Sequence, residues 1–363
     1  MLFLIYKQNK SQQVVIAEDQ KMSNVVIKKV NHESMGVQKA VIKILDILNW
    51  RSLLKGKKVF VKVNLISSEF VPGQCTSPLV LDALFGELSK YGYDITFGDA
   101  DLAAAHQCNK AAKVWGHLKL ADKYGAKFQN LSEDEIKKMK IGGKVFKELD
   151  IARTVIEADS IISVPVLKTH CLTELTCALK HFWGIVPRVR HQYHVVVDEA
   201  ISDINTLVKS KIAFSLVDGT IGMEGNGPRT GKPKICDILL GSTDSVAIDA
   251  LVAKYIGIDV PKHVKTAAER GLGSLNYKIV GDMLETNEFE HPDSDKQPIF
   301  FWEMSLRKTI LKPLLFNTPL FGIFAWIATK YNTFYYYHRF GKKYAKNIMN
   351  SSWYGKELKN MIS

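Results

Sequence analysis

Cysteine is scarce in this sequence, and no two cysteines stand at a close, paired spacing. The five cysteines occupy positions 75, 108, 171, 177 and 236, and no Cys-x-x-Cys occurs. An odd, scattered set is typical of a reducing compartment and argues against a disulfide framework. The closely spaced cysteine run that binds a ferredoxin-type cluster is also missing. We therefore expect a cytoplasmic protein without an iron–sulfur cluster.

We expect no targeting segment, and common nucleotide-binding motifs are missing as well. Residues 1–6 are apolar, but Lys7 ends the run, which leaves it too short for the core of a signal peptide. No Gly-x-Gly-x-x-Gly opens a helix, and the phosphate-loop motif does not occur. The best-known phosphate-binding signatures therefore do not explain what this chain binds.

What the sequence does have is a globular and basic composition. Its 363 residues are 46% hydrophobic and 24% charged, which excludes a mainly disordered protein. There are 49 lysines and arginines against 37 acidic residues, a net charge of +12. This excess favours an anionic partner, such as a phosphate- or carboxylate-bearing molecule, a membrane surface or a nucleic acid.

Strand and helix patterns alternate along the first 280 residues and predict an α/β fold. Residues 58–63 are a predicted strand, Thr76-Ser77-Pro78 opens a helix with a capping serine, and residues 94–97 form the next strand. This βαβ order implies parallel strands with a right-handed crossover. We predict a mostly parallel sheet flanked by helices, with a helical, aromatic and basic C-terminal extension. The predicted divisions are a core domain at 1–284, a linker at 285–299 and a tail at 300–363.

Residues 160–194 contain the strongest candidate site. Residues 160–167 are a predicted buried strand, and polar side chains follow at its tip, where open α/β sheets bind ligands. Apolar residues then recur with helical spacing from Leu175 to Val186. The opposite face of that predicted helix carries Thr173, Thr176, Cys177, Lys180 and Gly184. Such a face fits the wall of a site, and the alternative is a partly buried helix with two satisfied threonines.

Lysines at matching positions predict an anion site. Lys62 and Lys168 follow predicted strands, and in a parallel sheet they would lie at one edge and hold a phosphate or carboxylate. The alternative for any single lysine is a solvated strand end. We predict catalytic roles for His170, Lys168 and Lys180, with His170 moving a proton. The predicted substrate-binding residues are Lys62, Asn64, Thr76, Thr169, Thr176, Arg188 and Arg190.

Acidic residues in the last third of the core predict a divalent metal. Asp218 follows a predicted strand, Glu224 stands in a glycine-rich loop, and Asp249 lies in a predicted helix. Hard cations prefer carboxylate oxygens, and an anionic substrate could bring one to the site. For Asp249 the alternative is a helix-dipole or lysine partner. The loop at 225–231 fits a phosphate cradle and a hairpin turn equally well.

The tail is both aromatic and basic. Residues 303–363 contain ten lysines or arginines and two glutamates. Residues 314–328 are mostly apolar but fall short of the roughly 20 residues that a spanning helix needs. The sequence supports two readings of the tail equally well. The tail attaches to an anionic membrane surface, or it packs on the core or on a second subunit of a homo-oligomer. No nucleic-acid binding is expected, because the aromatic residues cluster with an apolar run.

Several motifs together resemble one known family. They are Lys62-Val63-Asn64, Gly98-Asp99, residues 165–170, 176–184 and 223–228, and Gly271-Leu-Gly273. They resemble the uncharacterised family called domain of unknown function 362, across residues 25–280. The resemblance implies no particular reaction, and many relatives carry an iron–sulfur module whose cysteines this chain lacks. We expect an enzyme acting on a small anionic substrate, and the alternative is a non-catalytic carrier or scaffold attached through the tail.

Overall fold

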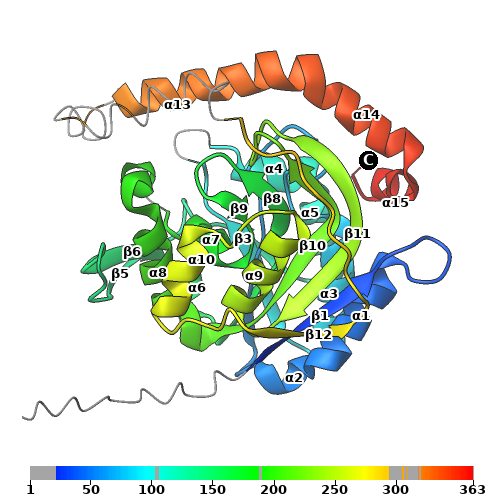
Figure 1. The fold of residues 1–363 in the computed structure, drawn as a ribbon, viewed down its shortest axis with the longest axis horizontal. Helices are drawn as coiled ribbons and strands as arrows, with labels where there is room; N and C mark the ends of the chain where they lie inside the picture. The colour runs from blue at the N-terminus through cyan, green and yellow to red at the C-terminus, as the bar shows by residue number, and fades with distance from the viewer. Residues whose placement is uncertain are drawn as a thin grey trace, which may run out of the picture.

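A ten-stranded sheet forms the centre of the molecule. The computed structural model describes residues 22–102, 106–187, 190–293, 305, 309, 318 and 320–362. The main path of the sheet has the order β12-β1-β11-β10-β7-β2-β3-β4, and β8 pairs with both β10 and β9. The pairs from β10 to β4 along this path are parallel, whereas β11 is antiparallel to β10 and β1. Helices flank the sheet, which confirms the predicted fold class (Figure 1).

The strands are short except for one long hairpin. The first four are β1 (Ser23–Lys29), β2 (Lys58–Lys62), β3 (Asp94–Asp99) and β4 (Lys127–Asn130). A separate two-stranded sheet contains β5 (Ile136–Lys140) and β6 (Glu148–Ala152). The remaining strands are β7 (Ser160–Ser163), β8 (Val166–His170), β9 (Glu174–Thr176), β10 (Ile212–Glu224), β11 (Lys232–Ser242) and β12 (Tyr277–Gly281).

Helices connect the strands and form the tail. Before the centre of the chain these are α1 (Val37–Leu48), α2 (Trp50–Leu53), α3 (Pro78–Lys90), α4 (Cys108–Val114), α5 (His117–Tyr124) and α6 (Arg153–Glu157). The middle contains α7 (Ala178–His181), the 3-10 turns η2 (Phe182–Ile185), η3 (His191–Val196) and η4 (Lys209–Lys211), α8 (Val197–Val208), α9 (Ser245–Tyr255) and α10 (Lys262–Glu269). The tail contains α13 (Leu320–Lys330), the π-helical η6 (Tyr331–Gly341), α14 (Lys342–Ser351) and α15 (Trp353–Ile362).

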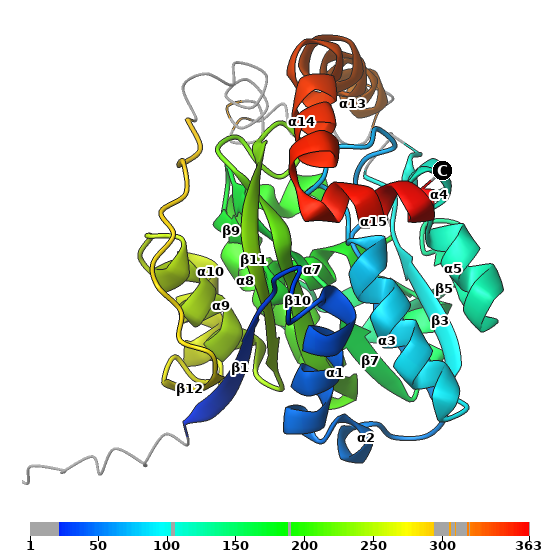
Figure 2. The same cartoon turned by 90° about the vertical axis from the view of Figure 1, so that its right-hand side faces the viewer.

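Two helical layers cover the two faces of the sheet. Helices α1 and α3 lie together on one face, and α8, α9 and α10 lie on the other (Figure 2). Ser77 caps α3 as predicted, because its hydroxyl accepts the Leu79 N–H at 3.3 Å and Pro78 occupies the first helical position. The apolar face of α3 is buried against the sheet at positions such as Leu84 and Leu88, both of which have no exposed surface.

The structure corrects three details of the central stretch. The predicted strand at 160–167 is two strands, β7 and β8, because Pro165 lacks an N–H and interrupts the ladder. The predicted helix begins only at Ala178, since Glu174–Thr176 pairs with β8 as β9. Strand β10 also continues past Asp218 to Glu224, so Asp218 lies inside a strand rather than at its tip.

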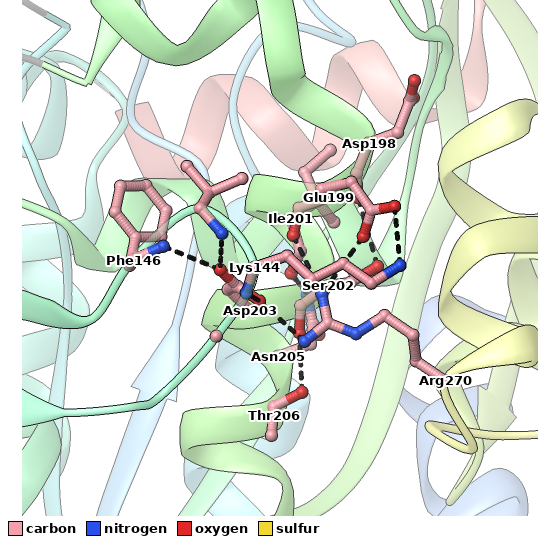
Figure 3. A network of polar contacts seen from close by, with 12 residues as sticks. Lys144, Phe146, Asp198, Glu199, Ile201, Ser202, Asp203, Asn205, Thr206 and Arg270 are labelled. Carbon is pink, nitrogen blue, oxygen red and sulfur yellow. Dashed lines mark hydrogen bonds and ion pairs between the residues drawn. The ribbon is translucent and has the colours of Figure 1, made fainter.

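A buried ion pair holds α8 in place beside the site region. The Asp203 carboxylate has no exposed surface and lies 2.6 Å from the Arg270 guanidinium that follows α10. The same carboxylate accepts the backbone N–H groups of Lys144, Val145 and Phe146 (Figure 3). These contacts fix the 144–146 turn and α10 to α8, which packs against the 3-10 turn η2.

The tail crosses the carboxyl edge of the parallel strands and packs on the core. Helices α13 and α14 lie along that edge (Figure 1). Tyr354 of α15 has no exposed surface, and its hydroxyl donates to the Asp237 carboxylate at 2.8 Å. Tyr336 of η6 is 5% exposed and donates to the Gly231 carbonyl. Core packing therefore accounts for one face of the tail. Residues 285–293 also contact the core, where Phe289 is 3% exposed.

Candidate functional site

A group of cationic and histidine side chains is buried near the carboxyl edge of the sheet. Lys62 ends β2, Lys168 lies in β8 and Lys180 lies in α7. Lys62 and Lys168 have no exposed surface, and Lys180 is 6% exposed. Each of these lysines is close enough to another cation of the group for their charges to repel. Lys168 lies near Lys62, and Lys62 and Lys180 each lie near Arg190, so these buried cations belong to one region of the protein.

Lys62 is neutralised within the protein. Its Nζ lies 2.8 Å from Asp99 Oδ1 and also donates to the Val63 carbonyl at 2.8 Å. Burial still lowers the pKa of Lys62, while Asp99 opposes that shift. Asp99 itself is fixed by the N–H groups of Leu65 and Ala100. Lys62 therefore belongs to a structural ion pair, and its ammonium has little capacity left for a substrate.

Lys168 is buried without a carboxylate partner. Its Nζ donates to the Gln74 carbonyl at 2.5 Å, and no acidic group of the described chain lies within ion-pair distance of it. Burial lowers the pKa of Lys168 to about 8. Thr176 is directly opposite Lys168 in the β8–β9 ladder, so the two side chains lie on the same face of the ribbon. The Thr176 hydroxyl is buried and makes no hydrogen bond to any residue that the structure describes.

Lys180 has even fewer protein contacts. Its Nζ lies 5.2 Å from the centre of the Trp183 ring, but it makes no hydrogen bond or ion pair within the described part of the chain. Burial lowers the pKa of Lys180 to about 8, with a smaller lowering by nearby Arg190, while Cys171 and Asp198 act in the opposite direction. Near pH 8 a large fraction of this amine is therefore neutral and can accept a proton.

His170 is held as one neutral tautomer. Its Nδ1 accepts the N–H groups of Leu172 at 3.0 Å and Thr173 at 3.4 Å, and a backbone N–H can only donate. The ring proton must therefore sit on Nε2. Burial, with repulsion from Lys180, His263 and Lys168, holds the pKa of His170 well below its ordinary value. His170 is thus suited to donate a hydrogen bond to a bound oxygen, whereas Lys180 is the better proton acceptor.

Three further buried side chains of the same region were not among the predicted site residues. The Trp183 indole N–H, His181 Nε2 and both ring nitrogens of His263 are buried and have no hydrogen-bond partner among the described residues. His181 and His263 are buried enough to lower their pKa values, and that of His263 falls to about 3. His263 comes from α10, 83 residues after Lys180 in the sequence, and no local pattern marks it. Trp183 and His181 did lie in the stretch that the sequence singled out.

The other predicted substrate-binding residues divide into two groups. Asn64, Thr76 and Thr169 have their side chains bonded to backbone groups, which tie β2 and β10 to the β7–β8 segment. Arg190 is 5% exposed and donates to the Val186 carbonyl at 2.9 Å, and its Nε–H has no acceptor within the described ranges of the chain. Arg188 lies outside the described residues. Thr176 and Arg190 are therefore the predicted binding residues that retain donors for a ligand.

The three carboxylates that the sequence predicted as metal ligands are each bonded to other groups of the protein. Asp218 accepts the Ser77 N–H and the Thr220 hydroxyl, and Asp249 accepts the N–H groups of Ala178 and Leu179. Glu224 forms an ion pair with Lys234 at 3.0 Å. Across the residues that the structure describes, no group of three or more histidines, cysteines or carboxylates could hold a metal ion. The three carboxylates instead stabilise turns, a helix start and the β10–β11 hairpin.

A surface depression at the opposite edge of the sheet is a weaker candidate. It holds about 150 Å³ and is lined by residues that include Lys58, Asp94, Thr154 and Glu157. These side chains are exposed or half-buried, and none of them has an unpartnered buried polar atom. The depression therefore lacks the desolvated charges that distinguish the carboxyl edge.

Comparison with known proteins places the chain in a family of undefined activity. It is 27% identical, over 236 residues, to "Thylakoid-associated protein sll1697" of Synechocystis sp.; the match covers 60% of this chain and 68% of that protein. A lactate racemase apoprotein from Thermoanaerobacterium thermosaccharolyticum superposes with a TM-score of 0.40 at 17% identity. That superposition covers 61% of this chain and only 54% of the racemase chain. A protein from Thermotoga maritima gives a TM-score of 0.37 at 14% identity, covering 66% of this chain and 60% of that one. Residues 59–254 match the family "Domain of unknown function (DUF362)", and the chain belongs to this family.

Proposed function

We propose that this protein is an enzyme that binds a small carboxylate- or phosphate-bearing molecule at the carboxyl edge and moves a proton on it. The observation that carries the proposal is the uncompensated buried charge. Lys168, Lys180 and Arg190 are at most 6% exposed, and none forms an ion pair within the described residues. Burying unpaired cations is costly, and an anionic ligand would offset that cost.

The unpartnered donors define how the ligand would be held. The Thr176 hydroxyl, the Trp183 indole N–H and the Arg190 Nε–H are buried, and no described residue accepts a hydrogen bond from them. Two or three such donors around a carboxylate or phosphate would give charge-assisted hydrogen bonds. Lys168 would supply positive charge beside Thr176, its partner in the β8–β9 ladder.

The two titrating groups would have different roles. Lys180 accepts the proton, because its pKa of about 8 leaves a neutral fraction at physiological pH. His170 donates its Nε2–H to an oxygen of the bound molecule on which negative charge develops. This division replaces the earlier expectation that His170 itself moves the proton. We propose that the protein acts in the cytoplasm, where cysteine side chains stay reduced.

Calorimetry tests binding without knowledge of the substrate. Inorganic phosphate and malonate are titrated at pH 8 in two buffers of different ionisation enthalpy. A bound anion raises the pKa values of Lys168 and Lys180, so binding should take up roughly one proton in total. Lys180→Met should lose at least half of that uptake, and the exposed control Lys39→Met should lose none. If neither phosphate nor malonate binds the wild-type protein, the proposed anion site is refuted.

Proton transfer is tested separately from binding. A panel of small carboxylates and phosphate esters is incubated in D₂O, and exchange of carbon-bound hydrogen is followed by NMR. The wild-type protein should catalyse exchange on at least one of them, and Lys180→Met should not. Anion binding without exchange on any compound would favour the carrier alternative over an enzyme.

A further inference from the structure

We propose that the outward face of the tail helix docks this protein on an anionic lipid bilayer. The inference is independent of the anion site. The face, which we call the outer tail face, consists of Ile323, Phe324, Ile327, Tyr331, Phe334 and Tyr335. These side chains are 44–65% exposed and recur with the spacing of one helical face. Trp326 lies beside them at 58% exposed, which makes an aromatic surface that nothing in the described chain covers.

The inner face of the same helix fixes the orientation of the outer tail face. Phe321 is 8% exposed and lies 5.6 Å from the His191 ring. The Asn332 amide, with its oxygen toward Arg229, accepts from the guanidinium at 2.8 and 2.9 Å. Thr333 donates to the Glu69 carboxylate at 2.8 Å, and Tyr336 packs with Val71 and Met223. Because these contacts hold the helix, the aromatic face cannot turn inward to be buried in the core.

The positive charge of the tail favours an anionic binding partner for the outer tail face. Residues 320–350 contain five lysines and arginines and no acidic residue. Lys330 lies over the Trp326 and Phe334 rings, and Arg339 lies over Tyr335 and Phe340, so the cations stand among the exposed aromatic side chains. Two copies of this surface would repel each other, which disfavours self-association. Basic residues combined with tryptophan and tyrosine are typical of helices that lie in the headgroup region of anionic membranes.

The helix would lie along the bilayer. None of the described helices is long and apolar enough to cross a membrane. The outer tail face runs parallel to the helix axis, and α13 lies across the carboxyl edge of the sheet (Figure 1). Docking through this face would therefore turn the carboxyl edge, with the candidate site beneath the tail, toward the membrane surface.

Vesicle co-sedimentation of the full-length protein tests the proposal. Vesicles of phosphatidylcholine alone are compared with vesicles of equal phosphatidylcholine and phosphatidylglycerol, at low and at high salt. The wild-type protein should bind the anionic vesicles at least about tenfold better, and salt should weaken the binding. The double variant Phe324→Ser/Phe334→Ser should lose roughly tenfold or more in affinity. The matched control is Met283→Ser, which replaces an apolar side chain that is 74% exposed and lies outside the tail.

Other outcomes overturn the proposal. Equal binding to neutral vesicles would show that charge does not select the surface. If the wild-type protein ignores both kinds of vesicle but dimerises in sedimentation velocity, and the double variant is monomeric, the face is a protein interface. Thermal melts of the double variant, which changes exposed side chains only, should match the wild type within about 2 °C. Calorimetric anion binding by the same variant separates this test from that of the proposed function.

Discussion

Replacing Lys180 by methionine should make the protein more stable while it weakens anion binding. The buried ammonium has a pKa of about 8, against 10.5 for an ordinary lysine. A difference of 2.5 units corresponds to about 3 kcal/mol of unfolding free energy at neutral pH. Methionine has a similar unbranched shape and no charge to desolvate. Loss of the cation–π contact with Trp183 subtracts about 1 kcal/mol, so the net gain should be about 2 kcal/mol.

The stability difference between Lys180→Met and the wild type should depend on pH, which a change in packing alone would not cause. Below pH 8 both the folded and the unfolded wild-type chains carry the Lys180 proton, and the folded state bears the full cost. Between pH 8 and 10.5 the unfolded chain binds more protons than the folded chain, so wild-type stability rises with pH. The advantage of Lys180→Met should therefore shrink across this interval and disappear above it.

Urea unfolding followed by fluorescence, from pH 7 to 10.5, measures the effect. A gain of about 2 kcal/mol corresponds to roughly 3 °C in melting temperature for a chain of this length. The exposed control Lys39→Met should change stability by less than about 0.5 kcal/mol at every pH. If Lys180→Met is less stable than the wild type at pH 7, or if its advantage does not change with pH, the ammonium is compensated and the reasoning is wrong.

Two further substitutions test other buried contacts. Asp99→Asn should lower the free energy of unfolding by about 3–5 kcal/mol, because it leaves Lys62 buried and unpaired. The exposed control Asp94→Asn should lower it by less than about 0.5 kcal/mol in the same chemical denaturation. Equally small effects of the two substitutions would show that Lys62 is solvated. Tyr354→Phe should lower the free energy of unfolding by about 1 kcal/mol, because it removes the hydrogen bond from the hydroxyl to Asp237. Tyr354→Ala should lower it by about 3–5 kcal/mol, because it opens a cavity beneath α15. If Tyr354→Ala does not change stability, the tail does not contribute to the core.

The sequence determined the main layout of the fold. The strand from residue 58, the capped helix at Pro78 and the strand from Asp94 were predicted because capping, proline position and apolar periodicity act over a few neighbouring residues. The same local reasoning failed at residues 173–176. There the apolar spacing fits a helix, but pairing with β8 makes an extended strand instead. Strand pairing depends on a partner elsewhere in the chain, which periodicity cannot show.

For the candidate site, the sequence identified the residue types and only the tertiary structure decided their partners. In the sequence, Lys62, Lys168 and Lys180 look alike, as cations that follow a predicted strand or line the helix beside one. In the structure Asp99 neutralises Lys62, whereas Lys180 faces an indole ring and has no acidic partner among the described residues. Electrostatic interactions depend on distance and burial, and both are set by packing between segments far apart in the sequence. For the same reason the sequence could not reveal that His263 approaches this group, or that Asp218, Glu224 and Asp249 are each bonded elsewhere.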